Sequence, residues 1–115
     1  GARGRAAIDR FNEEATEQVS AQLLADWHQN LDTSIRNPTP YYETQLAIHR
    51  VSPTIAGVTD RGVVYGPWLE GTSSRNRTTR FRGYSALRRA RQRTIARVPQ
   101  LVAGPQARLV AELSS

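Results

Sequence analysis

A periodic apolar stripe near the N-terminus constrains the fold more than any other feature of the sequence. Apolar side chains recur there at steps of three and four residues: Ile8, Phe11, Ala15, Val19, Leu23, Trp27, Leu31 and Ile35. This spacing places them on one face of an α-helix over residues 6–35, which would be about 40 Å long. Three short strands cannot cover so long a stripe, so we expect Trp27 or the turns near it to contact another chain. Residues 1–5 are small and basic, and we expect them to form a flexible N-terminus.

Prolines and an alternating pattern predict a β-meander after this helix. The segment Asn37-Pro38-Thr39-Pro40 ends the helix, because a proline disfavours helical backbone in the residue before it. From residue 41 to residue 51, apolar and polar side chains alternate, which is typical of a half-buried strand. Residues 54–59 and 63–65 are expected to form two further short strands. The whole meander spans residues 41–66.

The C-terminal part is predicted to be an Arg-rich loop followed by helices. Residues 71–82 are polar and indicate an extended loop. Residues 84–98 have helical spacing, Pro99 should kink or interrupt that helix, and Gly104-Pro105 should break the chain again before a short helix. The C-terminal helices together span residues 84–113. The expected fold is a single α+β domain with a long N-terminal helix, an antiparallel meander of about three strands and a C-terminal helix or broken helix pair.

The charges are segregated along the chain. Seven acids and two arginines lie between residues 9 and 43, whereas residues 71–111 hold ten arginines and no acid. All sixteen basic residues are arginine, and the net charge is +6. A molecule with an acidic and a basic pole is able to pair head to tail with copies of itself.

Composition and motifs give no support to an enzyme. The chain has no cysteine, which excludes disulfides, thiolate metal sites and cysteine nucleophiles. His28 and His49 have no partner at metal-ligand spacing, and no phosphate loop or nucleophile elbow is present. We expect no cofactor, no metal and no membrane span. Apolar residues make up 38% of the chain and aromatic residues 7%, which is typical of a domain that completes its burial against neighbours.

The stretch from Arg75 to Arg97 holds nine arginines in 23 residues, with Phe81 and Tyr84 between them. These residues could bind acidic surfaces of partner subunits, grip nucleic-acid phosphates, or form a solvated face. The arginines of the helix do not share one side, which favours partner pairing. The alternative function is a small basic nucleic-acid-binding module that uses this region.

One segment resembles a known family. It runs Val63-Val64-Tyr65-Gly66-Pro67-Trp68-Leu69-Glu70-Gly71-Thr72 and closes with Phe81-Arg82-Gly83-Tyr84. Tyr65, Trp68 and Phe81 are candidate structural anchors between the sheet and the last helix. The string resembles the aromatic, apolar, Glu-Gly-Thr segment of tail-completion and neck proteins of long-tailed bacteriophages. There too it follows a long helix and a meander. The resemblance covers about residues 6–100, although Ser73-Ser74-Arg75 replaces the proline-containing stretch of many relatives.

The resemblance implies a structural, non-catalytic virion subunit that is made in the host cytoplasm. It implies a ring of six or twelve identical subunits between connector and tail-tube proteins, with genomic DNA passing through the bore. Ring contacts join different faces of neighbouring subunits. The expected interface residues are Trp27, Glu70, Arg75, Arg77, Arg80 and Arg82.

Overall fold

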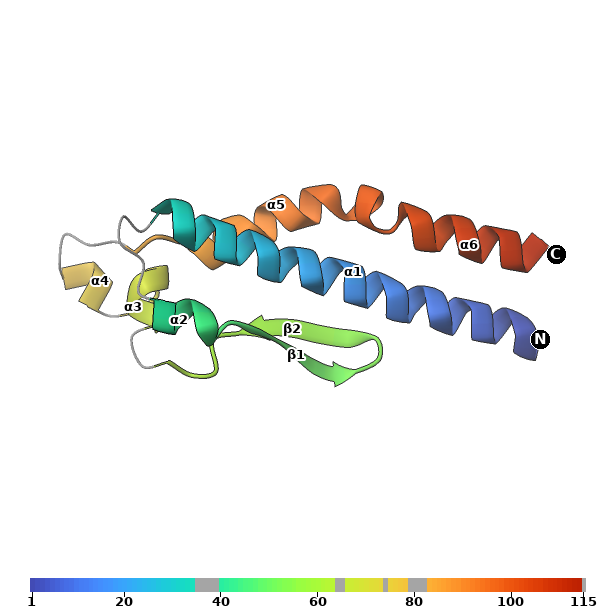
Figure 1. The fold of residues 1–115 in the computed structure, drawn as a ribbon, viewed down its shortest axis with the longest axis horizontal. Coiled ribbons are helices and arrows are strands. Elements are labelled where there is room, and N and C mark those ends of the chain that lie inside the picture. The colour runs from blue at the N-terminus through green and yellow to red at the C-terminus, as the bar shows by residue number, and fades with distance from the viewer. Residues whose placement is uncertain (35–39, 64–65, 74, 79–82, 115) are drawn as a thin grey trace.

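A computed structural model describes residues 1–34, 40–63, 66–73, 75–78 and 83–114, with the backbone alone at residues 34, 40, 41, 68, 75 and 78. The chain is an elongated α+β fold, 60 Å long and 24 × 23 Å across (Figure 1). Its radius of gyration is 17.6 Å. A compact domain of this length would have a radius of about 13 Å. The expected α+β class is therefore confirmed, in an unusually extended form.

The long N-terminal helix and the two C-terminal helices form a helical hairpin. Helix α1 spans Ala2–Ser34, α5 spans Ala86–Leu101 and α6 spans Ala103–Ser114. Helices α5 and α6 run back along α1, so that both chain termini lie at the same end (Figure 1). Residues 2–5 belong to α1, which corrects the expectation of a flexible N-terminus. Packing against α6 extends the helix this far, because Leu113 lies 3.6 Å from the Cβ position of Gly4.

The bend between the C-terminal helices follows Pro99, as its chemistry requires. Pro99 lies inside α5, and the helix ends two residues later at Leu101. Proline has no amide hydrogen to donate and its ring clashes with the preceding turn, so the helix does not continue straight. Pro105, which we expected to break the chain, lies instead in the first turn of α6. An amide there has no partner within the helix, so proline is tolerated.

The sheet has two strands among the described residues, where we expected about three. Strand β1 (Ala47–Ser52) pairs antiparallel with β2 (Ile55–Thr59), with Ile48 opposite Val58. Val63 lies outside both strands, and residues 64–65 lie outside the described part of the chain. The hairpin lies along α1 (Figure 1), and β2 and the end of α5 flank a common hollow on that helix.

The first half of the expected strand over residues 41–51 is wrong, because Pro40–Thr44 form the short helix α2. Tyr42 and Leu46 are both buried, 4% and 7% exposed. Their spacing of four residues fits a helical turn as well as it fits an alternating strand. Proline at the first helical position stabilises the turn and decides between the two.

Two short helices precede α5. Helix α3 spans Gly66–Glu70 and α4 spans Arg75–Thr78. Residues 71–82 are therefore not the wholly extended loop that we expected. Asn76 is buried, and its side chain accepts a hydrogen bond from the Ser73 amide at 3.0 Å while its own amide donates to the Ser73 carbonyl at 3.1 Å.

The apolar core occupies one end of the helical hairpin, which we call the core end. Its buried members are Trp27, Leu31, Tyr42, Leu46, Ala86 and Ala90. Trp27 meets Tyr42 edge to face, with ring centroids 6.5 Å apart. The other end, where α6 packs on the first turns of α1, we call the open end.

Candidate functional site

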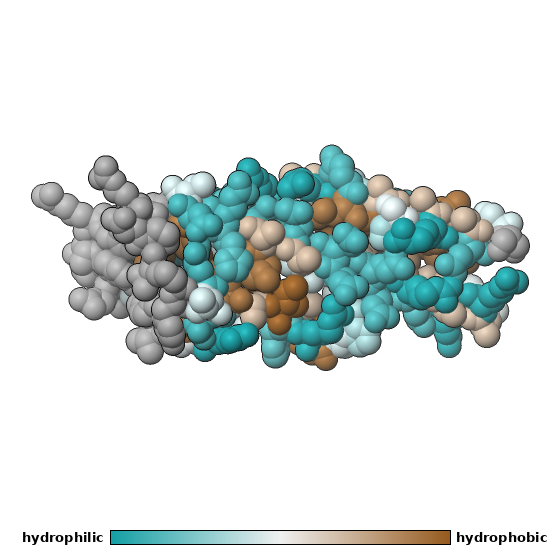
Figure 2. Space-filling model, in the orientation of Figure 1, coloured by the Kyte–Doolittle hydropathy of each residue, from teal (hydrophilic) through white to brown (hydrophobic). Residues whose placement is uncertain are grey.

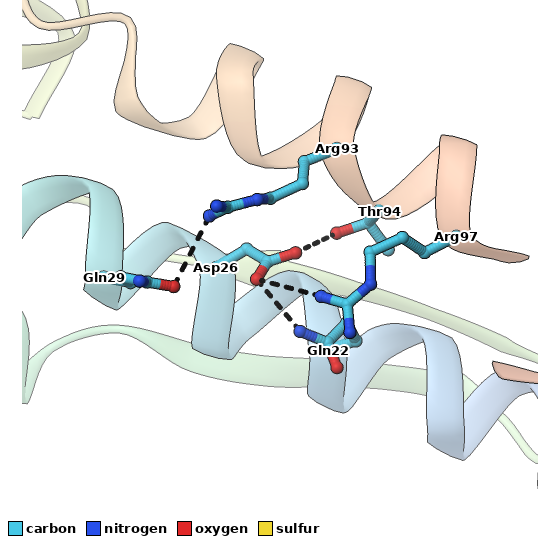
Figure 3. A network of polar contacts seen from close by, with 6 residues as sticks. All are labelled: Gln22, Asp26, Gln29, Arg93, Thr94 and Arg97. Atoms are coloured by element: carbon cyan, nitrogen blue, oxygen red, sulfur yellow. Dashed lines mark hydrogen bonds and ion pairs between the residues drawn. The ribbon is translucent and has the colours of Figure 1, made fainter. Parts of the chain in front are cut away.

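A buried polar cluster joins α1 to α5 at the core end (Figure 3). Asp26 is 2% exposed, and its carboxylate accepts hydrogen bonds from the Thr94 hydroxyl and the Gln22 side-chain amide, both at 2.9 Å. The Arg97 guanidinium lies 4.0 Å from the same carboxylate. Because a buried carboxylate needs such partners to offset lost hydration, the cluster fixes how the two helices face each other.

Further polar contacts continue along the same helix pair. The Asn30 side chain donates to the Ala86 carbonyl at 2.9 Å, and the Arg93 guanidinium lies 3.4 Å from the Gln29 side-chain oxygen (Figure 3). At the open end, Arg10 pairs with Glu112 and Arg108 pairs with Glu14; the two arginines and Glu112 are exposed, and Glu14 is half-buried.

The fold thus lays the acidic N-terminal segment beside the Arg-rich C-terminal segment. This corrects the expectation of one acidic and one basic pole. Asp26 and Glu14, two of the acids of residues 9–43, are paired within the chain. Segregation along the sequence becomes pairing in space because the two segments are antiparallel helices. Only the charges that remain are available to a partner.

Glu70 caps the N-terminus of α5. Its two carboxylate oxygens accept hydrogen bonds from the backbone amides of Leu87, at 2.8 Å, and Arg88, at 3.0 Å. Ser85, at the capping position itself, has a left-handed backbone (φ 50°) and makes no side-chain capping bond. A carboxylate at a helix N-terminus satisfies free amides and interacts favourably with the helix dipole. Glu70 thus has an intramolecular capping role that we did not expect, and its place at a subunit interface stays a prediction.

Two glycines, Gly71 and Gly83, let the backbone around Glu70 approach the N-terminal end of α5 closely. The amide of Tyr84 donates to the Leu69 carbonyl at 2.6 Å, and the amide of Ser85 donates to the Glu70 carbonyl at 3.1 Å. A Cβ on Gly83 would lie 2.3 Å from the Gly71 Cα, and both glycines have positive φ, +87° and +102°. The Glu-Gly pair of the resembling segment therefore has a structural explanation within this chain.

Trp27 does not lie where we expected it. It is 4% exposed and packs against Tyr42 of α2, so it belongs to the core instead of a partner interface. The error arose because α2, hidden in an apparently alternating strand, covers this part of the stripe. The stripe is left exposed elsewhere, since Ile8 at the open end is 46% exposed.

The remaining predicted residues are placed only in part. Arg77 of α4 is exposed. Arg80, Arg82, Tyr65 and Phe81 lie outside the described residues, and Arg75 and Trp68 are described by their backbone alone. The interface and anchor roles of these seven residues stay predictions.

Glu43, in α2, has a clearly perturbed acidity. Burial, together with the neighbouring Asp32 carboxyl, raises the pKa of Glu43 to about 7. Its Oε1 is buried without a hydrogen-bond partner in the described part of the chain. This carboxyl is therefore able to exchange a proton near neutral pH, at the contact between α1 and α2.

The sequence interpretation missed the Asp26 cluster and the Glu43–Asp32 contact. A polar residue beside the stripe, such as Asp26 next to Trp27, could have indicated a buried carboxylate. Its partners Thr94 and Arg97 are about 70 residues away, so pairing them needs the fold. Among the described residues, no three His, Asp or Glu side chains gather as metal ligands, and no helix has the length and apolar character needed to cross a membrane.

Comparison with known proteins gives no relative. No protein-family model matches the chain, and no curated protein and no solved structure is significantly similar to it.

Proposed function

We propose that this chain is a structural virion subunit of a tailed bacteriophage. In this role, copies form a ring at the neck or at the head-proximal end of the tail, and DNA passes through its bore. The ring joins connector and tail-tube proteins, six- or twelve-fold, and catalyses no reaction. The resemblance of the Glu70-Gly71-Thr72 segment and the order of a long helix, a β-hairpin and C-terminal helices support this proposal.

The observation that carries the proposal is the uneven burial of an elongated subunit. The chain is 60 Å long, but its core lies at one end of the helical hairpin. Large apolar side chains stay exposed on every main element, including Val51 (66%), Ile95 (64%) and Leu113 (53%). Apolar patches interrupt the hydrophilic surface in the space-filling view (Figure 2). Such a surface favours a subunit that completes its burial in an assembly.

The basic nucleic-acid-binding module is the second candidate. The exposed arginines of α5, such as Arg88 and Arg91, favour it. Arg93 and Arg97 contact α1 through Gln29 and Asp26, so the arginines of this helix are not all directed at solvent. This division of the arginines weakens the case for a continuous phosphate-binding surface.

One experiment separates the two functions. The full chain is purified, its mass is measured by sedimentation, and it is imaged under negative stain, while its affinity for duplex DNA is titrated against salt. Rings with weak DNA binding at physiological salt are expected. A particle of monomer mass whose DNA affinity falls steeply with added salt would overturn the ring and support the nucleic-acid-binding module.

A further inference from the structure

Two exposed faces of the chain carry opposite charges, each beside a large exposed apolar side chain. The basic face consists of Arg88, Arg91 and Ile95 of α5, which lie three and four residues apart on one stripe. The acidic face consists of Glu13 and Glu17 of α1 with Val51 of the β-hairpin, which line one open groove. Ile95 and Val51 are 64% and 66% exposed, the two most exposed large apolar residues that the structure describes.

These charges are left over after the fold has paired the others. Arg97 lies against Asp26, Arg108 pairs with Glu14, and Arg10 pairs with Glu112. In the part of the chain that the structure describes, the side chains of Arg88, Arg91, Glu13 and Glu17 contact no oppositely charged side chain. Both faces therefore keep their charge for a partner.

The two faces of one chain cannot meet each other. Ala86, Ala90 and Thr94 are the buried residues of α5 and face α1, which turns the basic face outward. The hairpin that carries Val51 packs on another flank of α1 than α5 does (Figure 1). Arg50 also lines the acidic groove, but it donates to the Pro53 carbonyl of its own hairpin at 3.2 Å.

We propose that the basic face of one copy binds the acidic face of a second copy. Arg88 and Arg91 then lie against Glu13 and Glu17, and Ile95 covers Val51. The contact joins two different faces, so each copy keeps one face free for a further copy. Such contacts close into a ring when the rotation from copy to copy divides a full turn. Exposed ion pairs contribute little by themselves, so apolar burial stabilises the contact and the charges set its orientation. This inference rests on the proposed function, because it names the faces that meet in the ring.

A cysteine pair tests the geometry, because the chain has no cysteine of its own. Ile95→Cys and Val51→Cys are made as separate proteins. A mixture of the two under mild oxidation should yield a disulfide-linked dimer of one copy of each, whereas either protein alone should yield none. As the matched control, Val110→Cys, 57% exposed on α6, should not link to Val51→Cys. A dimer formed by Ile95→Cys alone would mean that like faces meet, and would overturn the proposal.

Charge reversal tests the chemistry without requiring close sulfur geometry. Arg88→Glu with Arg91→Glu gives a chain whose two faces are both acidic, and Glu13→Arg with Glu17→Arg gives one whose two faces are both basic. Each variant alone should associate at least about tenfold more weakly than the wild type in sedimentation, because like charges then face each other. A mixture of the two variants should assemble again. Recovery on mixing also shows that both variants are folded.

The other outcomes separate this contact from the proposed ring. If each charge-reversed variant alone forms rings as readily as the wild type does, the proposed contact is overturned and the proposed ring is not. A wild-type chain that stays monomeric at about 1 mM overturns the ring and the contact together. Loss of DNA binding in Arg88→Glu with Arg91→Glu, with unchanged self-association, overturns the contact in favour of nucleic acid as the partner.

Discussion

The core end and the open end of the helical hairpin share the long helix α1 and differ in what covers it. At the core end, α2, α3 and the β-hairpin add a further layer over α1, and Trp27 and Leu31 are 4% and 2% exposed. At the open end, α6 packs on α1, and Ile8 and Leu113 are 46% and 53% exposed. A helix pair cannot bury a whole apolar stripe. The layer that α2, α3 and the β-hairpin add therefore decides which part of the helical hairpin has a buried core within the chain.

The residues between the helices differ in the same way. At the core end Ala86 and Ala90 are fully buried, and their small side chains let α5 approach α1 closely enough to seal the Asp26 cluster. At the open end the helices are joined by the exposed ion pairs Arg10–Glu112 and Arg108–Glu14. Buried polar groups are costly to disrupt, whereas exposed ion pairs contribute about 0–1 kcal/mol each. Stability should therefore be concentrated at the core end.

The largest expected effect is at Trp27. Trp27→Ala should lower the free energy of unfolding by about 3–5 kcal/mol, because it empties a buried aromatic site against Tyr42. Ile8→Ala at the open end is the matched control and should cost less than about 1 kcal/mol in the isolated chain. Urea unfolding followed by circular dichroism measures both. Equal losses at the two sites would contradict the difference between the ends.

The second-largest expected effect on the free energy of unfolding compares the loss of a buried carboxylate with the loss of a carboxylate in a surface ion pair. Asp26→Ala should cost about 2–3 kcal/mol, because the Thr94 hydroxyl and the Gln22 amide lose their acceptor. Glu14→Ala removes an exposed ion pair with Arg108 and should cost no more than about 1 kcal/mol. The same unfolding experiment compares them. If Glu14→Ala proves as costly as Asp26→Ala, the open end is more tightly held than its exposure implies.

A pH dependence should mark the α1–α2 contact. Burial and Asp32 raise the pKa of Glu43 to about 7, above the ordinary value of 4.5 that holds in the unfolded chain. The folded state thus binds the proton more tightly. Its stabilising contribution is complete below pH 4.5 and is lost as the pH rises through about 7. Stability should therefore fall as the pH rises from 4.5 to about 7, by less than the full linkage value, because solvent screens this partly exposed carboxyl.

Glu43→Gln tests this assignment, because the amide is neutral at every pH. The variant should show a flatter stability curve between pH 4.5 and 8, measured by thermal unfolding in a series of buffers. Its advantage over the wild type should be greatest at the alkaline side. An unchanged slope would assign the pH dependence to another group.

The smallest of these effects is at the cap of α5. Glu70→Ala should cost about 1 kcal/mol, because the amides of Leu87 and Arg88 lose their acceptor. Glu70→Gln keeps one acceptor oxygen, so its free energy of unfolding should lie between those of the wild type and Glu70→Ala. Hydrogen exchange at these amides gives a local readout, and faster exchange confined to the first turn of α5 is expected. Loss of self-association without faster exchange would place Glu70 at the subunit interface.

Much of the secondary structure could be predicted from local pattern. The stripe from Ile8 to Leu31 predicted α1, and Pro99 predicted the bend before α6. Tyr42 was misassigned because a spacing of four fits both a short helix and an alternating strand. The capping role of Glu70 was missed because its partners, Leu87 and Arg88, lie 17 and 18 residues further along.

The sequence by itself determined the α+β class, the long helix and its break points, because helical periodicity and proline act through neighbouring residues. Only the tertiary structure decided the use of the charges and of Trp27. The antiparallel packing of α5 on α1 brings Arg97 to Asp26, and α2 folds back so that Tyr42 covers Trp27. Whether a charge or an apolar side chain is satisfied within the chain depends on residues far away in sequence. No local sequence pattern shows which distant residues will pack together.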